Sequence, residues 1–482
     1  MYSIDGFSNQ SFLLSSVLAL CTFVMAKALK KLIMSLILQT SINGVSVEMV
    51  ENYELSKNAN LLEYSRAIRM AKDSARIQSG ATDIILGPSI FQEVKLYPQV
   101  IMNDMKPNYK FYPDHRSIAT RLEGTRYGQT INAVLIQNIE TVLQDRDILI
   151  DQNLSLNLQT QYLPDSASTL ADVETLFCYG ELARNNDKLN DAVDNLILSP
   201  YSFSEYSISE LYKLRKLRNM LKMKKSHNYM CDLVKSEIIA SSKRESVLSK
   251  NHILELIVQN ESFPEESLES MNFGFMCFVI CSIKHTWSQI SNLIIDVSMN
   301  RRVYKKLILE QKYLVKKYGN IYTGKILDKM KYLDAVFLES MRLAGSGEFL
   351  RVLEKDIFLS NGLKIQKSSV VKFSNFLYSN TSEVHFPNPY DFWPERHLLT
   401  SNQLSKISDK NIVWGISWKS CPYYVYASLN LKLFVAIFLR KYKIVFDNNS
   451  PAPQHQGYIF EENTIHKKSD INIQLFDISK EL

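Results

Sequence analysis

The sequence WGISWKSCPYY, residues 414–424, ends a polar loop on a single cysteine, Cys421, directly before an apolar segment. Pro422 has no backbone N–H and suits the first turn of a helix, so we expect a helix to begin near Tyr423. A helix N-terminus stabilises negative charge and lowers the pKa of a cysteine thiol. We therefore expect Cys421 to ionise and to act as a metal ligand. The alternative is a small buried apolar residue, which is the more frequent role of a cysteine before a proline.

Length and composition restrict the class of protein. The chain has 482 residues with 46% apolar content, enough to bury a large core, and only 15 glycines and 13 prolines. Few turn residues favour a mainly helical protein with small β-sheets. The formal net charge of +6 does not resemble the concentrated basic surface of a nucleic-acid binder, so we expect no nucleic-acid partner. The six cysteines form no CxxC pair, which is typical of a reducing compartment.

The N-terminal segment differs from the rest of the chain. Residues 12–26 are uncharged and almost wholly apolar or small, and Lys27, Lys30 and Lys31 follow them. Lysines after an apolar span place the C-terminal side in the cytosol. We predict that residues 1–40 form a lumenal stub and a transmembrane signal anchor in the endoplasmic reticulum membrane, with residues 41–482 as one cytosolic domain. Membrane lipid is then a partner. A helix pair on the membrane surface and a soluble core helix are the alternatives.

The middle of the chain is mainly helical by pattern. Residues 83–86 are predicted to form a short strand ended by Gly87 and Pro88, and residues 130–260 follow helical periodicity. Seven basic residues fall within residues 213–225. They indicate either a solvated helix face or a contact with anionic lipid headgroups.

A long helix is predicted after Ser262, which can cap its start. Residues 273–283 are nearly all apolar, too short to span a bilayer and suited to a helix buried on all sides. Lys284, His285 and Thr286 then interrupt the apolar sequence. Buried polar groups cost free energy unless they are paired. The interruption therefore indicates a functional site, a kink or a water channel, or else a single solvent-facing turn.

An ionic cluster is predicted between a helix and a later turn. Glu339 and Arg342 are three residues apart and share one face of a predicted helix. Arg396, in the later sequence FWPER, can add a second guanidinium to the same carboxylate. We expect these three residues to pin the turn to the helix.

The order of these features resembles the cytochrome P-450 superfamily of haem-thiolate monooxygenases, from about residue 60 to the C-terminus. The sequences FLRVLEKDI (349–357) and GELARN (180–185) are similar to its membrane-bound fungal branch, which modifies terpenoids. The resemblance implies the cytochrome P-450 fold, a single large helical domain. It also implies residue roles. Cys421 would be the axial ligand of the iron of haem b, and Arg351 and Lys419 would pair with the haem propionates. The family's structural triad would be Glu339, Arg342 and Arg396.

The resemblance also implies a function. The expected reaction inserts oxygen into a hydrophobic small molecule, a terpenoid-type intermediate of secondary metabolism. Electrons would come from NADPH through a separate reductase. His285 and Thr286 fall where the family delivers protons to bound oxygen.

The chain departs from the family pattern around the haem. Ser417 and Tyr423 replace two glycines of the usual loop, and a side chain at either place needs room and is penalised at positive φ. Lys284 and His285 replace the usual acid and threonine. A second hypothesis therefore stays open, in which the protein has the same fold, binds haem weakly or not at all, and acts as a binding or scaffolding partner.

Overall fold

The computed structural model describes 25, 49–50, 74–79, 81–86, 90, 93–94, 102–104, 131–144, 147–148, 150, 166–183, 186–196, 214–242, 253–259, 268–344, 348–360, 364–379, 387–389, 391–408, 412–415, 420–445, 458–461, 464–467 and 474–478. The predicted membrane anchor, residues 1–40, lies outside these residues except for Met25. No helix in the described part is both long enough and apolar enough to cross a bilayer.

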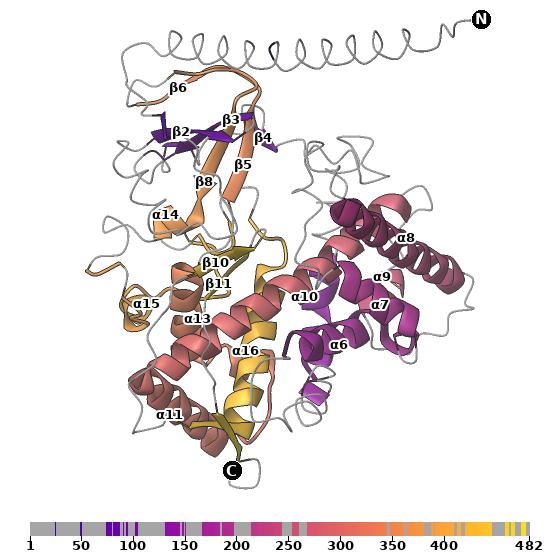
Figure 1. Cartoon of the computed structure of the whole chain (residues 1–482). Coiled ribbons are helices and arrows are strands. Elements are labelled where there is room, and N and C mark those ends of the chain that lie inside the picture. Colours follow the sequence, from indigo (N-terminus) through magenta and orange to yellow (C-terminus); the bar gives the residue numbers. More distant parts are fainter. Residues whose placement is uncertain are drawn as a thin grey trace, which may run out of the picture.

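Helices make up most of the described structure. In chain order they are α6 (Ser166–Tyr179), α7 (Asp187–Leu196), α8 (Leu214–Ser242), α9 (Ile253–Gln259), α10 (Leu268–Met299), α11 (Arg301–Tyr318), α12 (Gly324–Leu327), α13 (Lys331–Leu343), α14 (Asn375–Ser379), α15 (Glu395–Leu399) and α16 (Tyr424–Lys441). Figure 1 shows α10 and α16 in the middle of the helical part, with α11 at the end opposite the main sheet. The predicted fold class, mainly helical with small sheets, is confirmed.

The main sheet joins strands from the first 104 residues with strands from residues 348–374. Its six strands are ordered β1 (Met49–Val50), β2 (Ser74–Ser79), β3 (Ala81–Leu86), β8 (Val370–Ser374), β5 (Glu348–Leu353) and β4 (Met102–Asp104). Strand β3 contains the predicted residues 83–86 and pairs in parallel with β8. The hairpin partner β2 was not predicted. Its sequence SARIQS has few apolar residues, so alternation gave no signal there.

Shorter strands form two-stranded sheets elsewhere. They pair β6 (Ile357–Phe358) with β7 (Lys364–Ile365), β9 (Tyr442–Val445) with β12 (Gln474–Asp477), and β10 (Tyr458–Glu461) with β11 (Thr464–Lys467). The pairing of β9 with β12 brings the end of the chain back to the C-terminus of α16.

Helix α10 is the long helix predicted after Ser262. Phe275, Phe278, Val279 and Ile283 are at most 2% exposed, as expected for a core helix. The expectation that this segment is buried on all sides is wrong at Cys281, whose side chain is exposed. One face of the helix is therefore open within the described structure.

Helix α13 is buried along almost its whole length, from Tyr332 to Leu343. Its N-cap residue, Met330, makes no side-chain cap. Glu310 of α11 replaces that cap, because its carboxylate accepts the backbone N–H groups of Tyr332 at 2.6 Å and Leu333 at 3.0 Å. The start of α13 is thus held by a neighbouring helix.

Two further polar contacts connect α13 to the core. Ser340 Oγ donates to Asp296 Oδ2 of α10 at 2.6 Å. Lys432 of α16, which is fully buried, lies 2.9 Å from Asp334 of α13. A buried charge is tolerated only when it is paired, so Lys432 fixes α16 against α13.

Candidate functional site

The loop before α16 presents Cys421 through backbone and side-chain hydrogen bonds. The N–H of Cys421 donates to the carbonyl oxygen of Trp414 at 2.6 Å, and the Trp414 indole N–H donates to the Leu404 carbonyl at 2.6 Å. Gly415 has φ +93°, a conformation that favours glycine. The loop is therefore closed at its base, and the cysteine sits at the closing point.

Helix α16 begins at Tyr424, as predicted, directly after the loop. Tyr423, which occupies the place of a family glycine, has φ −98°, so its side chain causes no positive-φ strain. Its ring is buried and meets Phe278 of α10 edge-on, with ring centroids 5.1 Å apart. Tyr426 packs on the same phenylalanine at 5.7 Å. The lost glycine is thus replaced by an aromatic contact between α16 and α10.

The expectation of a lowered thiol pKa at Cys421 is wrong for the protein alone. Burial raises the pKa of Cys421 to about 11, although the backbone N–H of Tyr423 acts in the opposite direction. Desolvation of the thiolate outweighs the helix N-terminus, because the sulfur packs against the apolar cluster around Phe278 and Tyr426. The thiol is neutral at pH 7 until another group stabilises its charge.

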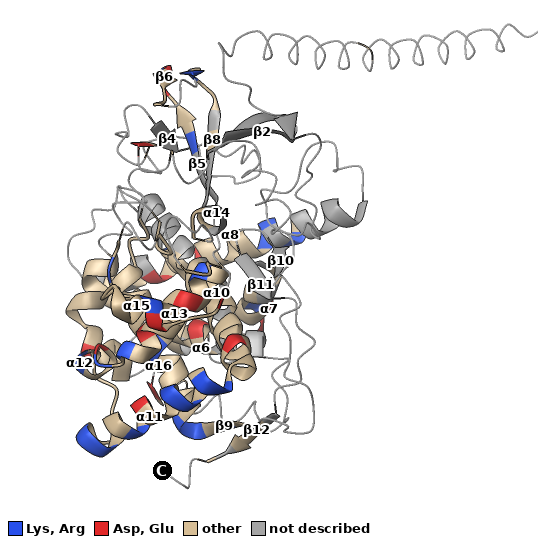
Figure 2. Cartoon of the chain, turned by 90° about the vertical axis from the view of Figure 1, so that its left-hand side faces the viewer, with Lys and Arg blue, Asp and Glu red and all other residues tan. Residues whose placement is uncertain are grey.

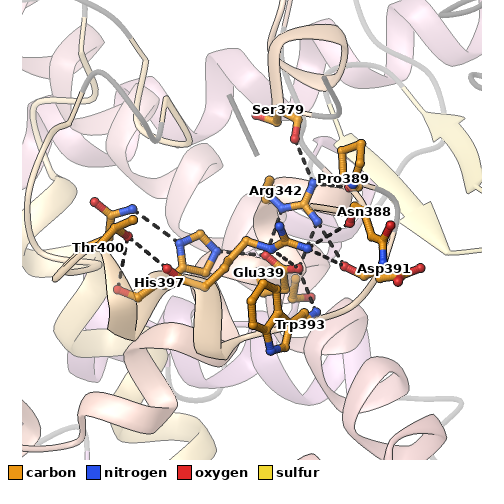
Figure 3. Close-up of polar contacts among 12 residues, drawn as sticks. Glu339, Arg342, Ser379, Asn388, Pro389, Asp391, Trp393, His397 and Thr400 are labelled. Carbon is orange, nitrogen blue, oxygen red and sulfur yellow. Dashed lines mark hydrogen bonds and ion pairs between the residues drawn. The ribbon is translucent and has the colours of Figure 1, made fainter. Parts of the chain in front are cut away.

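The structure brings Glu339, Arg342 and Arg396 together in one buried cluster. Figure 3 shows Glu339 and Arg342 at its centre. Glu339 accepts two hydrogen bonds from Arg342, at 2.8 and 2.9 Å, and one from Arg396 Nε at 3.1 Å. Burial raises the pKa of the Glu339 carboxyl, but the hydrogen bonds from Arg342 and His397 and the charge of Arg342 outweigh it and hold the pKa well below its usual range. The carboxylate is therefore ionised and fully paired.

Two members of this cluster were not predicted. Glu339 also accepts the backbone N–H of Trp393 at 2.8 Å and a contact from His397 Nε2 at 2.9 Å (Figure 3). Burial lowers the pKa of His397, and the Asn402 amide lies 3.5 Å from the other ring nitrogen. We therefore assign a neutral imidazole that donates from Nε2 to Glu339. The adjacency of His397 to Arg396 was the only signal in the sequence.

The two guanidinium groups hold the segment that leads toward the cysteine loop. Arg342 donates to the carbonyl oxygens of Ser379, Pro389 and Asp391. Arg396 donates to those of Pro387, Asn388 and Asp391. A single carboxylate thus orients two cations that together hold Pro387, Asn388, Pro389 and Asp391.

The polar interruption of α10 is buried in the protein. Ser282 donates to Glu174 of α6 at 2.6 Å, and Asn430 of α16 donates to the same carboxylate at 3.4 Å. Thr286 is 8% exposed and His285 is half-buried. Ser282 and Thr286 therefore face the interior of the protein. Glu174, which joins three helices, was missed by sequence reasoning.

The predicted propionate partners are placed only in part. Arg351 lies in β5, paired with Asp104 of β4 on one side and Val371 of β8 on the other. Its side chain is half-buried. Lys419, and the side chain of Lys284, lie outside the described residues.

Comparison with known proteins gives the family. The family model described as Cytochrome P450 matches residues 173–466, more than half of the chain. The chain therefore belongs to the cytochrome P450 family. A retinoic-acid-bound cyanobacterial CYP120A1 superposes with a TM-score of 0.68 at 16% identity, covering 86% of this chain and 93% of that one. That likeness supports the fold.

Fungal relatives match over shorter segments. "Cytochrome P450 monooxygenase idtP" of Claviceps paspali is 26% identical over 46% of this chain and 46% of its own length. "Cytochrome P450 monooxygenase ausG" of Emericella nidulans is 28% identical over 37% and 36%. "Dideacetyl fusicoccin A C-19 hydroxylase" of Phomopsis amygdali is 27% identical over 34% and 33%. The match thus spans about half or less of these relatives.

The donor set at Cys421 fits a haem iron. In the described part of the chain, no group of three or more His, Cys, Asp and Glu side chains could hold a metal ion. A porphyrin brings its own nitrogen ligands and needs one axial group from the protein. Cys421 offers one sulfur in a closed loop with apolar surroundings.

Proposed function

We propose that the protein is a haem-thiolate monooxygenase that inserts oxygen into a hydrophobic small molecule. The observation that carries the proposal is the placement of Cys421, at the closing hydrogen bond of a loop that opens α16, in a chain of the cytochrome P450 family. Haem b, held through this sulfur, supplies the activation of dioxygen. Electrons come from NADPH through a separate reductase.

The chain's own residues have distinct roles in this proposal. Cys421 holds the iron, and Arg351 and Lys419 pair with the haem propionates. Thr286 and His285, next to the buried Ser282–Glu174 contact, hold and move protons on α10. Glu339 and its cations keep the fold around the loop rigid.

The names of the relatives support a substrate class. One relative's name specifies hydroxylation of dideacetyl fusicoccin A, and others are monooxygenases of fungi. We infer a terpenoid-type intermediate of secondary metabolism as the substrate of this chain.

A reduced carbon monoxide difference spectrum tests the proposed function. The purified full chain, loaded with haem, is expected to show the Soret band of a thiolate-ligated iron. Loss of all haem on purification, from cells that load another cytochrome P450 in parallel, would contradict the proposal. That result would favour the binding or scaffolding alternative.

The membrane location is a separate part of the proposal. We infer that residues 1–40 anchor the protein in the endoplasmic reticulum membrane, because an uncharged run precedes three lysines. Residues 41–482 alone are expected to leave the membrane fraction during an alkaline carbonate wash, whereas the full chain stays. A truncated chain that still pellets with membranes would contradict the anchor.

A further inference from the structure

Helix α11 carries an unusual share of the protein's charge. Its 18 residues contain seven basic side chains and one acidic side chain, Glu310. The helix therefore has a formal charge of +6, equal to that of the whole chain. Figure 2 shows the blue segments along α11 at the lower end of the molecule.

The positive charges of α11 all lie on its exposed side. The basic residues Arg301, Arg302, Lys305, Lys306, Lys312, Lys316 and Lys317 are exposed. Glu310 faces inward and caps α13. The opposite side of the helix, with Val303, Leu307 and Leu314, is buried in the core.

Two apolar side chains lie among the cations. Leu309 is 66% exposed and Tyr313 is 59% exposed, and they are one turn apart. Large exposed apolar residues surrounded by charge are typical of the centre of a binding surface. We call Leu309, Tyr313 and the exposed cations of α11 the α11 face.

The arrangement is electrostatically unfavourable for the helix itself. Arg301 and Arg302 stand in the first turn, where the helix dipole disfavours positive charge. Arg301 with Lys305, and Lys312 with Lys316, are like-charge pairs four residues apart, and each such pair costs about 0.2–0.5 kcal/mol. A local arrangement that opposes helix stability is expected where a surface has a function.

Some of these cations have partners and others do not. Arg302 and Lys306 pair with Glu395 at 3.2 and 2.5 Å. Among the residues that the structure describes, Lys305, Lys312 and Lys316 have no acidic partner. These three lysines are available to a carboxylate from another molecule.

The position of the α11 face favours a protein in solution over a membrane. The main sheet, which receives the N-terminal strand β1, lies at the opposite end of the molecule from α11 in both views (Figures 1 and 2). A membrane that contacts the sheet end of the molecule would therefore lie away from α11. The buried side of α11 packs on the far end of α16, where Arg440 donates to Gln311, about 24 Å along that helix from its first residue, Tyr424.

We propose that the α11 face docks an acidic protein segment whose carboxylates pair with Lys305, Lys312 and Lys316 around an apolar contact to Leu309 and Tyr313. The positive charge of the face favours a negatively charged partner. Exposed ion pairs contribute little binding free energy, so the two apolar side chains supply most of the affinity. The partner sits away from the cysteine loop, so the proposal does not depend on the proposed function.

Fluorescence anisotropy with a labelled peptide of glutamates around a central pair of leucines tests this docking. The triple variant Lys305→Glu, Lys312→Glu, Lys316→Glu is expected to bind the peptide at least about tenfold more weakly than the unchanged protein. Its thermal unfolding temperature should not fall, because the changes remove like-charge pairs. The matched control is Lys222→Glu, Lys224→Glu, Lys225→Glu on α8, three exposed lysines. Both variants lose the same charge, from +6 to zero.

The outcomes separate the alternatives. Equal weakening in both triple variants, or no binding by the unchanged protein, would overturn the proposal. A third result would also overturn it. If the unchanged protein floats with phosphatidylserine vesicles, only the α11 variant loses this flotation, and both variants still bind the peptide, then the α11 face binds a membrane. If the α11 variant unfolds, Leu309→Ser with Tyr313→Ser replaces it, and unchanged peptide affinity there would also overturn the proposal.

Discussion

Replacing Cys421 with alanine is expected to abolish thiolate-ligated haem and all oxygenase activity. Cys421 is the described cysteine that stands in a closed loop at the start of a long helix, whereas Cys178 is fully buried in α6 and Cys281 is exposed on α10. The removed sulfur has no substitute within the loop. The measurements are the carbon monoxide difference spectrum and product formation by the full chain.

Cys281→Ala is the matched control for this change. It removes an exposed thiol and is expected to leave the thiolate Soret band and the haem content within about twofold of the unchanged protein. A thiolate Soret signature that persists in Cys421→Ala would defeat the assignment. Loss of the signature in both variants would show that the change at Cys421 acts through general destabilisation.

The second large effect is expected at Glu339. Glu339→Ala leaves Arg342 and Arg396 buried, at 1% and 6% exposure, without the carboxylate that pairs them. Breaking a buried ion pair by removing one partner costs roughly 3–5 kcal/mol. That is a large part of the stability of an ordinary domain, so folded protein with haem should not accumulate. Soluble yield and haem content measure the effect.

Glu395→Ala provides the comparison for Glu339. Glu395 also pairs with two cations, Arg302 and Lys306, but those side chains are 66% and 43% exposed. Water can replace the lost carboxylate there, so the expected cost is about 1 kcal/mol or less. Normal yield and haem content in Glu339→Ala would show that the buried cluster is dispensable.

Local spacing predicted the elements that depend on neighbours in sequence. The three-residue separation of Glu339 and Arg342 gave their ion pair, and Pro422 gave the start of α16. The apolar run of residues 273–283 correctly predicted a core helix. It did not predict that Cys281 is exposed, because periodicity does not show what packs on each face of a helix.

Contacts between distant segments could not be predicted. Glu174 and Ser282 are 108 residues apart, and neither lies in a motif that indicates the other. The pKa of Cys421 was predicted in the wrong direction. A helix N-terminus can be inferred from sequence, whereas desolvation depends on Phe278, which α10 brings from a distant part of the chain. His397 entered the Glu339 cluster because a short helix turned it inward.

The contact between Glu174 and Asn430 has a consequence for synthesis of the chain. These residues are 256 positions apart, so α6 leaves the ribosome long before α16 exists. At a translation rate of about 5–20 residues per second, Asn430 is made about 13–50 s after Glu174. During that interval Phe177 of α6, and Phe278 of α10 once it is made, lack Tyr426 of α16, which packs on both. We therefore expect the nascent chain to expose apolar surface, of the kind that chaperones bind, until α16 is made.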